Sequence, residues 1–105
     1  MNEIDVAELK RRRGAGDDFV LLDVREPAAI ETASIPWAPL IPMGEIPERF
    51  GELPHDKTIV VMCHGGGRSA RVTQFLEANG YDNAENLAGG IEAWSVQIDP
   101  TIPRY

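Results

Sequence analysis

Cysteine and basic residues are scarce in this chain, and no run of apolar residues is long enough to cross a membrane. The single cysteine, Cys63, cannot form an internal disulfide, which favours a reducing compartment. Residues 1–5 lack the basic and apolar regions of a secretory signal, so we expect the protein in the cytoplasm. Ten basic residues against 17 acidic ones give a net charge of −7, which argues against a nucleic-acid partner.

The length and composition describe one globular domain. A chain of 105 residues can bury a single core, and an apolar share of 43% is ordinary for such a domain. Runs of strand character alternate with segments of helical character, which is typical of an α/β fold. We therefore expect residues 1–105 to form one α/β domain.

The expected elements follow from strand-like runs, helix caps and glycine stops. Asp5 and Glu8 resemble a capping box, which predicts a helix over residues 6–13 that ends at Gly14. Prolines at 36, 39, 42 and 47 predict irregular structure with a short strand at 40–41. The other expected elements are strands at 19–24, 59–62 and 84–87 and helices at 27–32, 45–50, 70–79 and 91–98.

The only cysteine stands where an apolar strand runs into a glycine-rich loop. Residues 59–62 are typical of a strand buried on both faces of a parallel sheet. Such sheets present ligand sites at the carboxyl ends of their strands. Three successive glycines at 65–67 let the backbone turn its N–H groups inward, and Arg68 and a helix start follow. The pattern predicts a thiolate in an anion-binding loop rather than an inert buried cysteine.

The residues around Cys63 each allow more than one role. Loop N–H groups, the helix dipole and Arg68 should all lower the pKa of the thiol. His64 could help to hold an anion or tune the thiolate, or it could point to solvent. Ser69 could donate a hydrogen bond to a bound anion, although a helix cap is the commoner role for serine at such a place.

Two charged residues lie at the end of the first buried strand, on the side where the Cys63 loop should lie. Asp23 and Arg25 could hold each other, or they could support the loop from behind. We favour support of the loop over a direct part in the chemistry.

Five segments together resemble the single-domain rhodanese-like sulfurtransferases. They match that family in order and spacing and run through nearly the whole chain: Leu21–Pro27, Ser34–Pro36, Ile41–Met43, Cys63–Ser69 and Asn86–Trp94. The resemblance implies a rhodanese-like α/β fold, with a central, mostly parallel sheet of about five strands and helices on both faces.

The resemblance also implies a thiosulfate sulfurtransferase mechanism. The Cys63 thiolate would attack the outer sulfur of a small donor anion, thiosulfate or a persulfide, and become a persulfide. A thiol or protein acceptor would then remove that sulfur, with no metal or organic cofactor and no membrane involved. We expect Asp23 and Arg25 in support and the following residues at the donor: His64, Gly65, Gly66, Gly67, Arg68 and Ser69.

Two other functions fit parts of the pattern. Cysteine phosphatases and arsenate reductases also place a thiolate in a loop that ends in arginine, but phosphatases of that architecture have five residues between the two. Here four residues separate Cys63 from Arg68, which predicts a smaller cradle that suits one sulfur atom better than a phosphoryl group. A sulfur carrier that works only with a partner protein is the non-enzymatic alternative, and turnover with small thiols would separate it from an enzyme.

Overall fold

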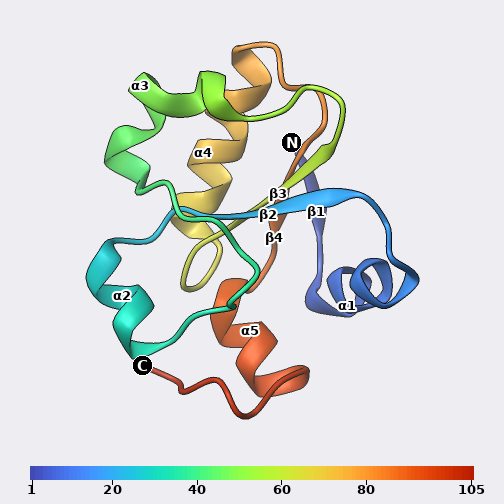
Figure 1. Cartoon of the computed structure of the whole chain (residues 1–105), viewed down its shortest axis with the longest axis vertical. Coiled ribbons are helices and arrows are strands. Elements are labelled where there is room, and N and C mark those ends of the chain that lie inside the picture. Colours follow the sequence, from blue (N-terminus) through green and yellow to red (C-terminus); the bar gives the residue numbers. More distant parts are fainter.

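A four-stranded parallel sheet forms the centre of the computed structural model, which describes residues 1–105 (Figure 1). The strand order is β1-β4-β3-β2, and every neighbouring pair is parallel. The strands are β1 (Asn2–Ile4), β2 (Phe19–Asp23), β3 (Thr58–Met62) and β4 (Ala84–Leu87).

Helices connect the strands, as parallel pairing requires. The α-helices are α1 (Val6–Ala15), α2 (Pro27–Thr32), α3 (Ile46–Arg49), α4 (Gly67–Ala78) and α5 (Gly90–Gln97), and two 3-10 turns, η1 (Met43–Glu45) and η2 (Phe50–Glu52), flank α3. None of these helices is both long and apolar enough to span a membrane.

The sheet separates two hydrophobic cores. Side chains of β3 alternate between them, so that Ile59 and Val61 enter one core while Val60 and Met62 enter the other. The first core lies under α3 and α4, and the second lies under α1 and α5. Both faces of the sheet are therefore covered, which confirms the predicted α/β class and explains the continuous apolar run of β3.

The strands differ from the expected ones in two details. The sheet has four strands rather than about five, because the segment at 40–41 makes only a single bridge, Asp23 to Leu40. Prolines on both sides of that segment, at 39 and 42, lack the N–H that a longer ladder needs. The edge strand β1 was not expected, since three residues carry too little pattern to reveal a strand.

Helix boundaries differ by a few residues from the expected ones. Asp5 caps α1 by accepting a hydrogen bond from the Glu8 amide at 2.9 Å, as predicted. The helix continues through Gly14 to Ala15, and Gly16 ends it in the left-handed conformation with φ 72°. The helix expected at 45–50 is divided into η1, α3 and η2, and the last helix begins one residue earlier than expected, at Gly90.

Candidate active site

Cys63 follows β3 directly and is buried, with 1% of its surface exposed. Its Sγ accepts a hydrogen bond from the backbone N–H of Gly66 at 3.1 Å and another from the Ser69 hydroxyl at 3.3 Å. Both donors come from the loop and the first turn of α4. The chain therefore surrounds the sulfur with hydrogen-bond donors, which stabilise a thiolate more than a neutral thiol.

These donors control the ionisation of the thiol. Burial raises the pKa of Cys63, but hydrogen bonds from the Ser69 hydroxyl and from the backbone amides of Ser69, Gly66 and Arg68 outweigh burial, so that the pKa lies below that of an ordinary thiol. Arg68 contributes here through its amide, while its guanidinium is exposed and makes no ion pair.

Ser69 is not the cap of α4. The N-cap is Gly66, at φ 106°, and it caps without a side-chain hydrogen bond. Ser69 lies inside the first turn of the helix, beyond the capping position, fully buried and with its hydroxyl on the sulfur. Of the two roles considered for Ser69, capping is therefore wrong, and its hydroxyl contacts Cys63 itself.

The start of α5 holds the first part of the loop. The amides of Ile91 and Glu92 donate to the carbonyls of Cys63 and His64 at 3.0 and 3.1 Å. Gly90 lies so close beneath them that a Cβ atom there would stand 2.4 Å from the His64 oxygen. Gly90 therefore has a steric reason, because no side chain fits there between α5 and the loop, whereas a Cβ on Gly89 would meet the Cβ of Ala93 within α5 at 2.5 Å.

Asn86 supports the same loop from β4. Its Nδ2 donates to the carbonyl oxygen of Gly66 at 3.3 Å and to the Glu3 carboxylate at 3.0 Å. The amide of that same Gly66 faces the sulfur. Asn86 thus helps to fix the orientation of a residue whose amide contacts Cys63, a role that sequence reasoning did not assign to it.

Asp23 and Arg25 hold each other. The Arg25 guanidinium is fully buried and donates through Nη2 to Asp23 Oδ2 at 2.7 Å and through Nε to Oδ1 at 3.0 Å. Its Nη1 donates to the Tyr105 hydroxyl at 2.8 Å. Neither charged side chain makes a hydrogen bond to the loop at 63–69, so the favoured support of the loop does not act through direct hydrogen bonds.

His64 lies against the C-terminal segment. Its ring stacks on Tyr105 with centroids 4.2 Å apart, and its Nε2 lies 3.8 Å from Glu92 Oε2. The ring therefore has protein on two sides and makes no hydrogen bond to the sulfur. Tyr105 contacts both His64 and Arg25. No pattern in the C-terminal sequence predicts these contacts between distant parts of the chain. No three His, Cys, Asp or Glu side chains lie close enough together to hold a metal ion.

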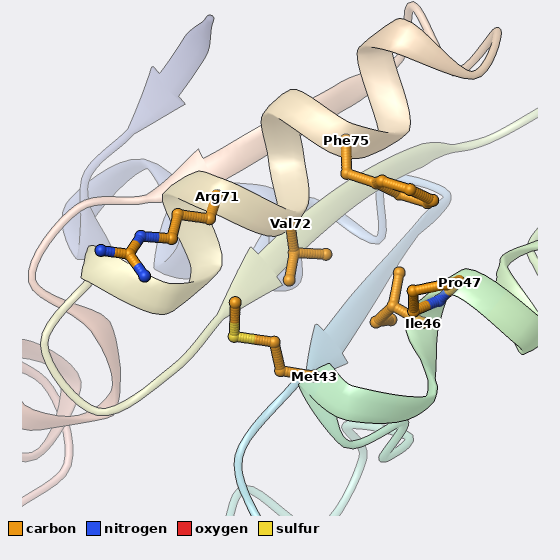
Figure 2. A pocket seen from close by; sticks show the side chains of 6 residues that line it. All are labelled: Met43, Ile46, Pro47, Arg71, Val72 and Phe75. Carbon is orange, nitrogen blue, oxygen red and sulfur yellow. The ribbon is translucent and has the colours of Figure 1, made fainter.

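A mostly apolar pocket lies between α3 and α4 (Figure 2). Figure 2 shows the side chains of Met43 and Val72 approaching each other across it. The pocket has six lining residues: Met43, Ile46, Pro47, Arg71, Val72 and Phe75.

Comparisons with known proteins agree on one family. The family model described as the rhodanese-like domain matches residues 5–97. A sulfurtransferase of Allochromatium vinosum is 41% identical over 95 residues, which cover 90% of this chain and 89% of that one. The crystal structure of a rhodanese-related protein from Thermoplasma volcanium covers all of both chains with a TM-score of 0.87 and 32% identity. A human single-domain sulfurtransferase is similar over 92% of this chain and 97% of its own, with a TM-score of 0.80 and 25% identity.

Proposed function

This chain belongs to the rhodanese-like domain family, and from that membership we propose that it moves a sulfane sulfur from a small donor anion such as thiosulfate to a thiophilic acceptor through a persulfide on Cys63. Its sulfurtransferase relatives and rhodanese fold support the transfer of sulfur in general. The observation that carries the specific mechanism is the Cys63 sulfur, which has two hydrogen-bond donors and a lowered pKa.

In the first half-reaction the Cys63 thiolate attacks the outer sulfur of thiosulfate. A bond forms between the two sulfurs, the S–S bond of thiosulfate breaks, and sulfite leaves with the electron pair. The charge of the donor would face the exposed guanidinium of Arg68 and the backbone amides of the loop at 64–69. A lowered pKa favours this step, because only the thiolate is the nucleophile.

In the second half-reaction an acceptor removes the terminal sulfur of the persulfide. Cyanide would take it as thiocyanate, and a thiol would take it as a new persulfide, which regenerates the Cys63 thiolate in both cases. Each half-reaction balances without an added oxidant or reductant. Amides that hold the starting thiolate would hold the persulfide anion as well, so that they stabilise both resting forms of the enzyme.

The physiological setting is also part of the proposal. A cytoplasmic thiol or an acceptor protein is the partner that fits the chemistry best, and residues 1–105 would act as one rhodanese-like domain. The lone cysteine supports a reducing compartment.

Intact-mass measurement tests the covalent step. Incubation with thiosulfate should add the mass of one sulfur atom to the protein, and dithiothreitol should remove it. Cys63→Ser should take up nothing. Sulfur uptake by that variant, or no uptake by the native protein from thiosulfate or any persulfide donor, would exclude the mechanism.

Turnover tests separate the enzyme from its alternatives. Steady formation of thiocyanate from thiosulfate and cyanide is expected, with no hydrolysis of an aryl phosphate. A single stoichiometric transfer without turnover would favour the carrier. Phosphate hydrolysis without thiocyanate would favour the phosphatase.

A further inference from the structure

The pocket between α3 and α4 has the size of a small organic group. Its volume is about 220 Å³, and four of its six lining residues are hydrophobic. Phe75 and Pro47 stand at one end of the view in Figure 2, and Met43 and Val72 stand nearer to the first turns of α4. A pocket with such walls favours an apolar occupant over a hydrated ion.

Cys63 does not itself line the pocket, but the chain connects the two along two directions. Along α4, Val72 lies three residues, less than one turn, beyond Ser69, whose hydroxyl contacts the sulfur at 3.3 Å. Val72 and Ile46 also share a core cluster with Cys63. A ligand bound against Val72 would therefore lie less than one turn of α4 from Ser69, the residue whose hydroxyl contacts the Cys63 sulfur.

The second direction runs across the edge of the sheet. The Val24 amide donates to the Met62 carbonyl, and the Met43 amide donates to the Val24 carbonyl, each at 3.0 Å. The backbone at Met43 is thus two hydrogen-bonded segments away from the end of β3, where Cys63 lies. At about 5 Å for each inter-strand spacing, the separation is roughly 10 Å. That span is comparable to the length of a small organic donor in an extended form.

The pocket is polar at one end only. Figure 2 shows the Arg71 side chain extending away from Phe75 and Pro47, toward the N-terminal end of α4. Arg68 lies one turn earlier on the same helix, and both arginines are exposed without a carboxylate partner. The opposite wall differs, since Arg49 is engaged by Glu45 and Glu52. Arg71 lines the pocket and Arg68 precedes it by one helical turn, so in a chain of net charge −7 this end of the pocket favours an anionic group.

We infer that this pocket binds the apolar substituent of a small organic sulfane-sulfur anion, while Arg68 and Arg71 face its charged head and its terminal sulfur meets Cys63. The inference rests on the proposed function. With a thiosulfonate as donor, the thiolate attacks the terminal sulfur, a Cys63 persulfide forms, and the sulfur–sulfonyl bond breaks. The sulfinate leaves with the electron pair, so that atoms and charge balance as they do with thiosulfate.

A homologous series of donors tests the pocket. Methanethiosulfonate and butanethiosulfonate have the same head and differ by three methylene groups, whose burial in an apolar pocket favours the longer donor. Partial burial should make kcat/KM for the butyl donor about tenfold higher in the native protein, with thiocyanate formation as the readout. Met43→Gln keeps the length of the side chain but makes the wall polar, and it should reduce that ratio to about twofold or less. A ratio measured within one sample does not depend on the fraction of folded protein.

Arg71→Ala tests the charged end. It should raise KM for both thiosulfonates by a similar factor and leave their ratio intact. Val96→Gln, on the exposed side of α5, is the control for Met43→Gln, and Lys10→Ala, an exposed cation of α1, is the control for the lost charge. Both controls should behave as the native protein does.

The outcomes separate this inference from the proposed function. Turnover of thiosulfate with a butyl-to-methyl ratio near one, or a ratio that Met43→Gln does not change, would overturn the pocket assignment alone. If Cys63 takes no sulfur from thiosulfate or from either thiosulfonate, the proposed function and the pocket assignment are both wrong.

Discussion

At the scale of single residues, the chemistry depends on how the sulfur of Cys63 is solvated. The side chain is buried, which by itself would raise the pKa of the thiol. The Ser69 hydroxyl and the loop amides replace the lost water and outweigh that effect. These fixed donors therefore favour the thiolate of Cys63 over its neutral thiol.

Ser69→Ala should destabilise the thiolate form of Cys63 relative to the thiol without disturbing the fold. A hydrogen bond to an ionised group contributes about 1.5 kcal/mol, so its loss should raise the pKa of Cys63 and lower the thiolate fraction at neutral pH about tenfold. Alkylation by iodoacetamide, followed against pH, measures this directly: the rate should rise at higher pH than in the native protein.

Ser95→Ala is the matched control for that measurement. Ser95 is also a buried serine, but it lies on α5 and its hydroxyl donates to the Ile102 carbonyl. Its replacement should leave the alkylation profile of Cys63 unchanged. Equal profiles for Ser69→Ala and the native protein would mean that the loop amides alone set the pKa.

At the scale of elements, the site is a junction of three segments. The end of β3 carries Cys63, the N-terminus of α4 supplies donors to its sulfur, and the N-terminus of α5 supplies donors to the carbonyls of residues 63 and 64. The two helix starts thus hold opposite sides of one loop. This arrangement requires the backbones of α5 and the loop to pack so closely at Gly90 that no Cβ atom fits between them.

Gly90→Ala should therefore impair the site. The added methyl group would stand 2.4 to 2.7 Å from backbone atoms of Cys63 and His64, at a φ of 58° that alanine adopts poorly. The loop would have to move, and a displacement of about an ångström can reduce a rate on the order of a hundredfold. Thiocyanate formation by the folded variant is the measurement.

Gly14→Ala provides the comparison. Gly14 lies within α1, where a Cβ would meet nothing within 4 Å, and alanine favours a helix over glycine by about 1 kcal/mol. The melting temperature should rise slightly while the sulfurtransferase rate stays the same. If Gly90→Ala behaved in the same way, the contact between α5 and the loop would not matter for the reaction.

At the scale of the whole molecule, a buried ion pair connects the sheet to the C-terminal segment. Arg25 joins Asp23 at the end of β2 to Tyr105, whose ring stacks on His64 beside the Cys63 loop (the C-terminus lies next to α2 in Figure 1). Burial disfavours the charged form of Arg25, but its hydrogen bonds to Asp23 and Tyr105 outweigh burial and raise its pKa. Arg25 therefore stays charged, and its hydrogen bonds hold Asp23 and Tyr105 together.

Asp23→Asn should destabilise the entire domain. It would leave the Arg25 charge buried without its counter-ion, a change that typically costs about 3 kcal/mol or more. Since a domain of this size is stable by only about 5–15 kcal/mol, the midpoint of urea unfolding should fall substantially. Replacing both partners, with Asp23→Leu and Arg25→Met, should restore part of that stability, because no unpaired charge remains. A single variant as stable as the native protein would show that Arg25 finds another partner.

Features that depend on neighbours in the sequence could be predicted from the sequence by itself. The run from Thr58 to Ser69 contains a buried strand, a glycine-rich turn and the start of a helix. Local backbone preferences suffice to place Cys63 at the carboxyl end of a strand in a parallel sheet. The cap of α1 at Asp5 followed from side-chain and amide groups three residues apart. The α/β class followed from the alternation of such segments.

Features that depend on which segments become neighbours in space were decided by the tertiary structure. Ser69 reaches the sulfur because Gly66 takes the capping position, Asn86 reaches Gly66 from another strand, and Tyr105 meets Arg25 across 80 residues of chain. The pocket between α3 and α4 likewise exists only because these two helices pack together. A hydrogen bond or an apolar contact depends on distances of a few ångströms, and over long sequence separations only the packed sheet and its two cores determine those distances.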